Sequence, residues 1–236
     1  MIDIHCHIIP GVDDGASDLE EALEMARIAY ADGIRHIIAT PHFANTYLTD
    51  RNKVLHGVET LRSALEKAAL PVQIYPGNEV RLESAEFVRQ HAKERNFCFL
   101  GPAERFILLE QSWKRYNEDT PEVLRWLLEQ GIQPIIPHPE RHLFFRRQPE
   151  LLLQLIKMGA WTQVSVDSLL GKNGEDAKSF GEWLIDEKKA HTLATDAHNP
   201  RRKPNLSLGY EIVRRLAGEA EAEAMHERAA RIIAAE

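Results

Sequence analysis

The sequence has few cysteines, no long apolar run and no excess of basic charge. The two cysteines among its 236 residues, Cys6 and Cys98, cannot build a disulfide framework, which is typical of a reducing compartment. No stretch approaches the roughly 20 apolar residues of a membrane span, and the N-terminus lacks the basic and apolar regions of a signal peptide. The net charge of −7 argues against a nucleic-acid partner, because a phosphate backbone calls for a basic surface. We therefore expect a cytoplasmic protein without membrane insertion.

Short β-like runs alternate with longer amphipathic segments along the chain. A helix, a glycine and a short buried strand recur in ADGIRHIIAT, EQGIQPIIPH and KMGAWTQVSV. This alternation predicts βα units and a parallel sheet. We expect an α/β fold, a distorted TIM-like barrel of about seven β/α units, in a single domain over residues 1–236. A doubly wound open sheet is the main alternative, but its Gly-rich dinucleotide fingerprint is missing after the first strand.

The expected elements follow from apolar periodicity and from helix-end signals. Ser17 and Glu20 fit a capping box that begins the first helix, and Gly33 fits its end. Strands are expected at 2–9, 35–40, 72–75, 106–109, 133–136, 162–166 and 191–195. The later helices are expected at 50–68, 84–95, 120–130, 148–158, 175–189, 206–217 and 219–235.

Ionisable side chains follow every expected strand except 162–166 at its C-terminal end. In a β/α barrel these ends converge on one face, where such enzymes place their active sites. Any one of these residues alone fits a turn, an exposed histidine pair or a salt bridge. Burying these charged side chains together without cations would cost a large free energy. His, Asp and Glu are ligands of Zn, Mn and Fe. We therefore expect a metal site. The residues are His5, His7, Asp13, Asp14, His42, Glu79, Glu110, His138, Asp196 and His198.

Other catalytic classes fit less well. A cysteine-dependent phosphatase needs an arginine six positions after its nucleophile, and Val12 and Glu104 occupy those positions. The sequence contains no Gly-x-Ser-x-Gly elbow and no P-loop. Outside the motifs, Tyr47 in the loop 43–50 is a candidate for the mouth of the site, and His142 for a contact behind the ligands.

Five motifs resemble those of the polymerase-and-histidinol-phosphatase (PHP) superfamily. They are IDIHCHIIPGVDDGA, TPH at 40–42, GNEV at 77–80, PHPER at 137–141 and TDAHN at 195–199. Within the superfamily, the start of the chain, PIIPHPER and TDAHN are similar to the bacterial manganese-dependent protein-tyrosine phosphatases of capsule and exopolysaccharide operons. The resemblance covers nearly the whole chain.

The resemblance implies three divalent metal ions, with manganese expected and iron, zinc or magnesium as alternatives. It implies that Glu79 bridges two of them and that Arg141 contacts the substrate phosphate. A second basic residue should do so as well; Arg202 is the choice, with Arg201 and Lys203 as alternatives. The nine implied ligands are His5, His7, Asp14, His42, Glu79, Glu110, His138, Asp196 and His198.

The implied function is phosphotyrosine hydrolysis, on a bacterial tyrosine autokinase that controls capsule or exopolysaccharide synthesis. Four ionised carboxylates and three divalent ions leave a local charge of about +2, which suits a phosphomonoester dianion. Metal ions lower the pKa of bound water, so that a bridging hydroxide can attack phosphorus. Histidinol-phosphate phosphatase, another PHP phosphoesterase and a non-catalytic metal-binding module are the alternatives, and a homo-oligomer is left open.

Overall fold

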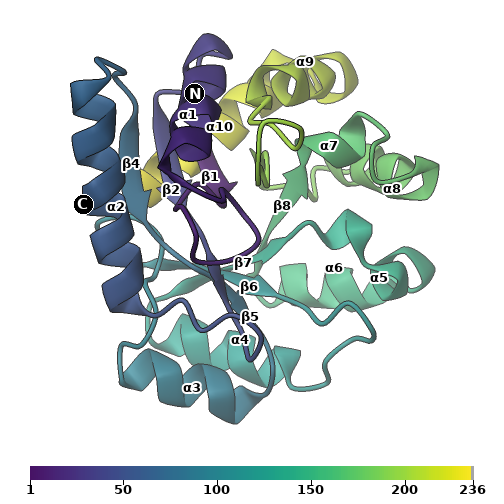
Figure 1. The fold of residues 1–236 in the computed structure, drawn as a ribbon. Coiled ribbons are helices and arrows are strands. Elements are labelled where there is room, and N and C mark those ends of the chain that lie inside the picture. Colours follow the sequence, from purple (N-terminus) through teal and green to yellow (C-terminus); the bar gives the residue numbers. More distant parts are fainter. Residues whose placement is uncertain (235–236) are drawn as a thin grey trace.

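The computed structural model describes residues 1–234, in which helices surround a set of central strands (Figure 1). Within these residues no helix is both long and apolar enough to cross a bilayer. The strands are β1 (Ile2–Cys6), β2 (His36–Ala39), β3 (His42–Phe43), β4 (Gln73–Pro76), β5 (Glu79–Arg81), β6 (Phe106–Glu110), β7 (Gln133–Pro137), β8 (Trp161–Ser165) and β9 (Thr192–Ala194). The helices are α1 (Leu19–Ala31), α2 (Arg51–Lys67), α3 (Ala85–Lys93), α4 (Thr120–Glu129), α5 (Leu143–Arg147), α6 (Pro149–Lys157), α7 (Val166–Leu169), α8 (Glu175–Asp186), α9 (Leu206–Ala217), α10 (Glu219–Ile233) and the 3-10 helix η1 (Pro139–Arg141).

The strands form two parallel sheets rather than one closed ladder. One sheet has the order β1-β2-β4 and the other the order β3-β5-β6-β7-β8-β9. The division falls where Pro41 separates β2 from β3 and where Pro76 ends β4, because proline has no N–H to continue a ladder. Beyond β9, Ala197 accepts a backbone hydrogen bond from His7 at 2.8 Å, next to β1. The expected α/β class with parallel strands is confirmed, whereas the sheet is not closed into the expected barrel.

Most expected helices are present within a few residues of their expected bounds. The structure adds β3, β5, α5 and α7, which are too short for periodicity to indicate. The predicted capping box is wrong by one residue. Asp18 accepts from the Glu21 amide at 2.9 Å, and the Glu21 carboxylate accepts from the Ser17 amide at 2.7 Å, so an aspartate caps the helix. The last expected helix, 219–235, ends at Ile233, and its final residue lies outside the described residues.

Helix α2 packs closely on the chain segment that leaves β1. Its buried face includes Val54, Val58 and Leu61 at helical spacing. On the same helix, a Cβ at Gly57 would lie 2.4 Å from Cγ2 of Ile9, closer than any real contact. Because Ile9 comes two residues after an expected ligand, the close approach of this helix helps to fix the backbone that carries the site.

We predict that Gly57→Ala lowers the free energy of unfolding by about 1–2 kcal/mol through overpacking. Alanine is more favourable than glycine in a helix interior by about 1 kcal/mol. The substitution would therefore raise the free energy of unfolding if there were space for the methyl group. In an Ile9→Ala background the space exists, and Gly57→Ala should then stabilise the protein. Chemical denaturation of the four proteins in this double-mutant cycle measures the difference. Equal effects in both backgrounds would contradict the packing account.

Candidate metal centre

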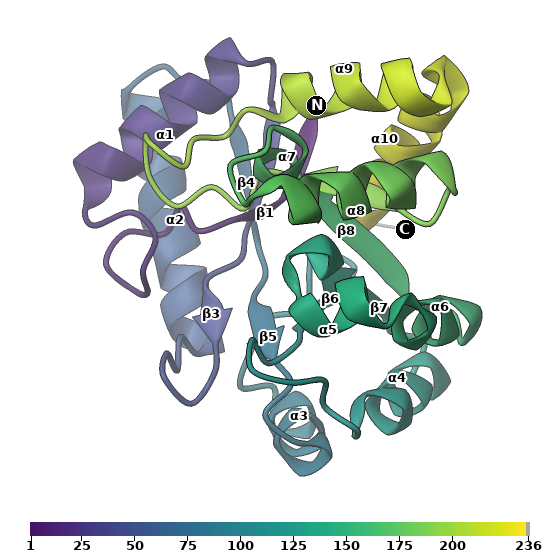
Figure 2. The same ribbon diagram turned by 90° about the vertical axis from the view of Figure 1, so that its right-hand side faces the viewer.

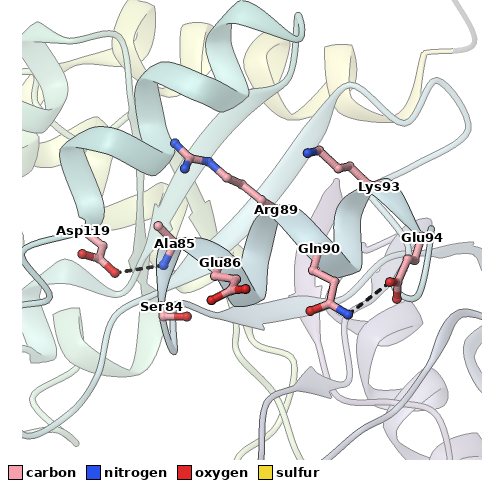
Figure 3. Close-up of a pocket in the computed structure, with 8 residues that line it drawn as sticks. All are labelled: Ser84, Ala85, Glu86, Arg89, Gln90, Lys93, Glu94 and Asp119. Atoms are coloured by element: carbon pink, nitrogen blue, oxygen red, sulfur yellow. Dashed lines mark hydrogen bonds between the residues drawn. The ribbon is translucent and has the colours of Figure 1, made fainter.

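A small cavity of 150 Å³ lies where the strands end. A larger hollow of 710 Å³ runs along α3 (Figure 3), but no histidine lines it, and two of its side chains pair locally: Asp119 accepts from the Ala85 amide at 2.9 Å, and Gln90 donates to Glu94 at 3.1 Å. The small cavity is instead surrounded by histidines, carboxylates and arginines, so the chemistry is concentrated there. It is lined by Asp14, His42, Glu79, Glu110, Trp113, His138, Arg141, Asp196, His198 and Arg202.

The structure brings all nine expected ligands together. Among residues 1–234, four groups place their His, Asp and Glu ligand atoms within 4.8 Å of one another, and these groups contain the nine residues and no others. Their role as ligands is a prediction that the proximity supports. The groups are His7, Asp14, His42 and His198; His5, His7 and Asp196; His5, Glu79 and His138; and His42, Glu79 and Glu110.

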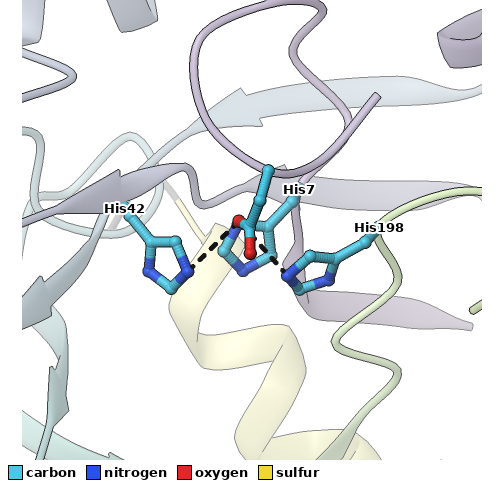
Figure 4. A group of neighbouring side chains, drawn as sticks. His7, His42 and His198 are labelled. Atoms are coloured by element: carbon cyan, nitrogen blue, oxygen red, sulfur yellow. Dashed lines mark ion pairs between the residues drawn. The ribbon is translucent and has the colours of Figure 1, made fainter. Parts of the chain in front are cut away.

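Histidines from three parts of the chain converge on one point. His5 and His7 lie two apart on extended backbone, so both rings face the same side, and their Nε2 atoms are 3.2 Å apart. His7, His42 and His198 point toward one another in Figure 4. The Asp14 Oδ1 atom lies 3.4 Å from His42 Nε2 and 3.6 Å from His198 Nε2. The loop after β1 thus brings a carboxylate over rings supplied by three strand ends.

Glu79 lies at the centre of the cluster and is 1% exposed. Its Oε2 atom is 3.4 Å from His5 Nε2 and 2.9 Å from His42 Nδ1, while its Oε1 atom is 2.9 Å from His138 Nε2. Two ligand atoms bound tetrahedrally to one metal ion at about 2.1 Å are about 3.4 Å apart. The separations around this carboxylate are therefore close to those of a shared cation.

One buried contact shows that the donor set fits a cation. His42 Nδ1 is 2.9 Å from a Glu79 oxygen, yet the pair lacks hydrogen-bond geometry, and this nitrogen has no hydrogen-bond partner. Buried polar atoms are rarely left unpaired. A divalent ion between the nitrogen and the carboxylate would satisfy both groups, and nitrogen and oxygen donors without sulfur suit manganese, iron, zinc or magnesium.

The pKa values of the cluster show how its charges depend on one another. Burial alone would lower the pKa of His42, but neighbouring carboxylates, Glu79 foremost, raise it to about 10. Burial and then the nearby His7 lower the pKa of His198 to about 3. Burial would raise the pKa of Glu79, but His5 and His42 hold it well below its usual range. Protonated rings thus compensate the carboxylates, and metal ions can replace these protons.

Polar side chains behind the expected ligands fix their orientation. Asp13 was expected within the metal site, but neither it nor Gln163 was predicted to have this role. Asp13 Oδ2 lies 2.7 Å from His7 Nδ1 and accepts from the His42 amide at 2.9 Å, while Gln163 Oε1 lies 2.9 Å from His5 Nδ1. With Nδ1 engaged in this way, each ring presents Nε2 to the cavity. The sequence offers a signal for each residue: Asp13 lies in VDDG, and Gln163 lies in 162–166, the one expected strand that no ionisable side chain follows.

Two arginines and a tryptophan complete the wall of the cavity. Arg141 Nη1 and Arg202 Nη2 both donate to Oδ2 of Asp196, at 2.5 Å and 2.8 Å. The Trp113 ring stacks on His138 with centroids 5.2 Å apart, and the Arg141 guanidinium lies 4.8 Å from its centroid. Trp113, which is 42% exposed on the loop after β6, was not predicted as part of the site, because no motif surrounds it.

The structure also places the remaining candidate residues. Arg202 lines the metal-centre cavity, whereas Arg201 lines only a neighbouring cavity and Lys203 lines neither of the two. The geometry therefore favours Arg202 for contact with phosphate. His142 is fully buried, and neither of its ring nitrogens has a hydrogen-bond partner. The Tyr47 ring lies against His42, with centroids 5.9 Å apart, which is the position expected for the mouth of the site.

Comparison with known proteins identifies the family. The family described as capsular polysaccharide synthesis, CpsB/CapC, matches residues 1–234. The chain belongs to the CpsB/CapC family. It is 37% identical over 204 residues to tyrosine-protein phosphatase YwqE of Bacillus subtilis, covering 86% of this chain and 79% of that protein. It is 30% identical over 220 residues to tyrosine-protein phosphatase CpsB of Streptococcus agalactiae, covering 90% of this chain and 89% of that protein.

Solved structures agree with this assignment to CpsB/CapC. A structure from the work on YwqE of Bacillus subtilis and CpsB of Streptococcus pneumoniae, described as unique metal-dependent tyrosine phosphatases, superposes with a TM-score of 0.95 at 34% identity, covering 100% of this chain and 95% of that one. The phosphotriesterase homology protein of Escherichia coli has a TM-score of 0.59 at 13% identity, with 98% and 97% of the two chains covered. That second likeness is one of fold alone.

We predict that Asp13→Asn weakens metal binding about 10- to 100-fold, as changes behind metal ligands commonly do. Each carboxylate oxygen of Asp13 accepts an N–H, since Oδ1 accepts from Gly15 and Oδ2 from His7 and His42. An asparagine in either orientation would turn its NH₂ group toward a donor. Metal content after dialysis and calorimetric titration measure the effect.

Asp176→Asn is the matched control for this substitution, because Asp176 is exposed on α8 away from the cluster. Its metal affinity should equal that of the unchanged protein. Equal metal affinity in Asp13→Asn and Asp176→Asn would show that Asp13 does not orient the ligands.

Proposed function

We propose that the chain is a metal-dependent tyrosine phosphatase. The observation that carries this conclusion is the placement of the nine-residue donor cluster beside Arg141 and Arg202 around one small cavity. Relatives that are 30% and 37% identical are named tyrosine-protein phosphatases, which supports the substrate class. With divalent ions bound, the pocket would be cationic and would fit a phosphoryl group. The protein supplies no cysteine nucleophile there, since both cysteines are buried outside the cavity.

The residues of the chain have distinct parts in this reaction. Arg141 and Arg202, aligned by Asp196, would bind phosphoryl oxygens and stabilise the charge that spreads over them during transfer. When bound, divalent ions would supply Lewis acidity and lower the pKa of water. The histidines and carboxylates would hold those ions, while Asp13 fixes His7 at Nδ1. A tyrosine phenolate leaves readily because its pKa is about 10.

We also propose the finer points that the sequence resemblance implies. The metal ions are three in number and are manganese, Glu79 bridges two of them, and all nine donor residues act as ligands. The buried histidine and carboxylate donors support this set. The proposed substrate is a phosphotyrosine protein in the cytoplasm, a bacterial tyrosine autokinase, which is consistent with a family described by capsular polysaccharide synthesis.

We further propose that the two sheets make up a distorted PHP-type barrel and that residues 1–236 are one domain. The hydrogen bond from His7 to Ala197, together with helices placed around the strands (Figure 2), supports a barrel-like arrangement. One hydrophobic cluster includes residues from Cys6 to Met225, and the family match spans residues 1–234, which supports a single domain. The last two residues of the proposed domain lie outside the described residues.

The activity is tested with a substrate panel on the metal-loaded enzyme. Phosphotyrosine peptides should be hydrolysed in preference to phosphoserine peptides and histidinol phosphate, and chelation should abolish the activity. His42→Ala should lower it by about 100-fold or more, since even partners behind a ligand cost 10- to 100-fold. A higher kcat/KM on histidinol phosphate would replace the proposed substrate, and activity that survives chelation would contradict metal dependence.

Trp113 provides a test of preference for an aromatic substrate. Its ring is partly exposed on the wall of the cavity, where it can pack against the phenyl ring of phosphotyrosine. We predict that Trp113→Ala raises KM for phosphotyrosine about tenfold while that for a small alkyl phosphate is unchanged, and that Trp113→Phe retains most of the affinity. Equal losses on both substrates would show that the ring only positions Arg141.

A further inference from the structure

A second cavity, of 230 Å³, adjoins the metal cavity. The two share three residues, Arg141, Asp196 and Arg202, which therefore form the wall between them. Beyond this wall the second cavity is built by the end of β8 and by residues that follow β8 and β9, and no histidine lines it. It is lined by Arg141, Ser165, Asp167, Lys172, Asn173, Thr195, Asp196, Arg201 and Arg202.

The charges around this cavity are predominantly positive. Four cationic side chains face two carboxylates, Asp167 and Asp196, and both carboxylates are already engaged. Asp167 Oδ1 accepts from Lys172 Nζ at 2.8 Å and from Asn205 Nδ2 at 3.2 Å. Asp196 accepts from the two arginines of the shared wall. In a chain of net charge −7, this is a local surplus of cations beside the metal centre.

Donor groups at this cavity remain available. Within residues 1–234, Arg201 bonds only through its backbone amide, which donates to Asn199, so the five N–H donors of its guanidinium are unused. Lys172 is 44% exposed at its side chain and uses one of its three donors on Asp167. A bound anion would receive charge-assisted hydrogen bonds in a partly enclosed site, where such bonds are stronger than on an open surface.

We propose that this cavity binds an anionic side chain of the phosphotyrosine substrate, a carboxylate or a second phosphate, within two residues of the phosphotyrosine. The inference rests on the proposed phosphatase function. The spacing follows from the shared wall, since an anion on the far side of Arg141 and Arg202 is separated from the phosphoryl group by little more than the two guanidinium groups. An extended peptide advances about 3.3–3.6 Å per residue, so one or two residues span this distance.

Matched peptides test this subsite on the metal-loaded enzyme. Each peptide carries one phosphotyrosine. A glutamate, or a glutamine in the matched peptide, stands one or two residues before or after it. At one or more positions, the glutamate peptide should show about a tenfold lower KM than its glutamine partner, with similar kcat, and the difference should shrink as salt is added. Equal KM values at every position, for glutamate and for a second phosphotyrosine, would overturn the proposal.

Substitutions then assign the effect to the cavity. The double variant Lys172→Gln with Arg201→Gln should lose the preference for the anion while its kcat/KM on the glutamine peptides is unchanged. Lys203→Gln, an exposed neighbour that lines neither cavity, should retain the preference. The charge-preserving variant Lys172→Arg with Arg201→Lys should retain it too, which separates charge from folding. An equal loss on glutamine and glutamate peptides would contradict an anion subsite.

A second phosphotyrosine in place of glutamate distinguishes the two sources of the anion. A lower KM than that of the glutamate peptide assigns the cavity to phosphate, and an equal or higher KM assigns it to a carboxylate. If no phosphotyrosine peptide is hydrolysed at all, the proposed function fails. In that case calorimetry with the same uncleaved peptides still decides the subsite, because an absent difference in Kd between glutamate and glutamine would overturn it independently.

Discussion

The compensation of buried negative charge around Glu79 is the constraint on which the site depends. A carboxylate that is 1% exposed must be neutralised by neighbouring groups, and here histidines from three strand ends surround it. Without metal ions, protonated rings supply the positive charge. Divalent ions would supply it more effectively and would release those protons. The loop after β1, the hydrogen bonds of Asp13 and the close packing of α2 on Ile9 all serve to hold this arrangement of donors.

The same balance of charge explains how an acidic chain can act on a phosphate ester. A net charge of −7 argues against an extended phosphate backbone as a partner, but it does not exclude one phosphoryl group. Arg141 and Arg202 both pair with Asp196, so this carboxylate would neutralise metal ions with one oxygen while it aligns two cations with the other. With metal ions bound, the result would be a small cationic region at the strand ends that adjoins the neighbouring cavity lined by Lys172 and Arg201.

The sequence predicts the donor cluster well because strand geometry is local. Two-residue spacing places His5 and His7 on one side, and parallel strands bring their C-terminal ends together. The contacts between distant residues were not predictable in this way. Gln163 meets His5 across 158 residues, and Trp113 lies in a loop whose path no periodicity encodes. Prolines also divide the strands where a continuous barrel was expected. This division was not predicted, because the pattern of apolar residues indicates strands but not which of their amide donors are missing.

The central claim is that the nine donors hold divalent ions around Glu79. Crystals of the manganese-loaded protein, measured on both sides of the manganese absorption edge, test it most directly. The account predicts anomalous peaks about 2.0–2.3 Å from the His5, His7 and His42 ring nitrogens and the Glu79 oxygens. Anomalous peaks only at surface carboxylates, or no peak among the nine donors of crystals grown with manganese, would contradict this claim.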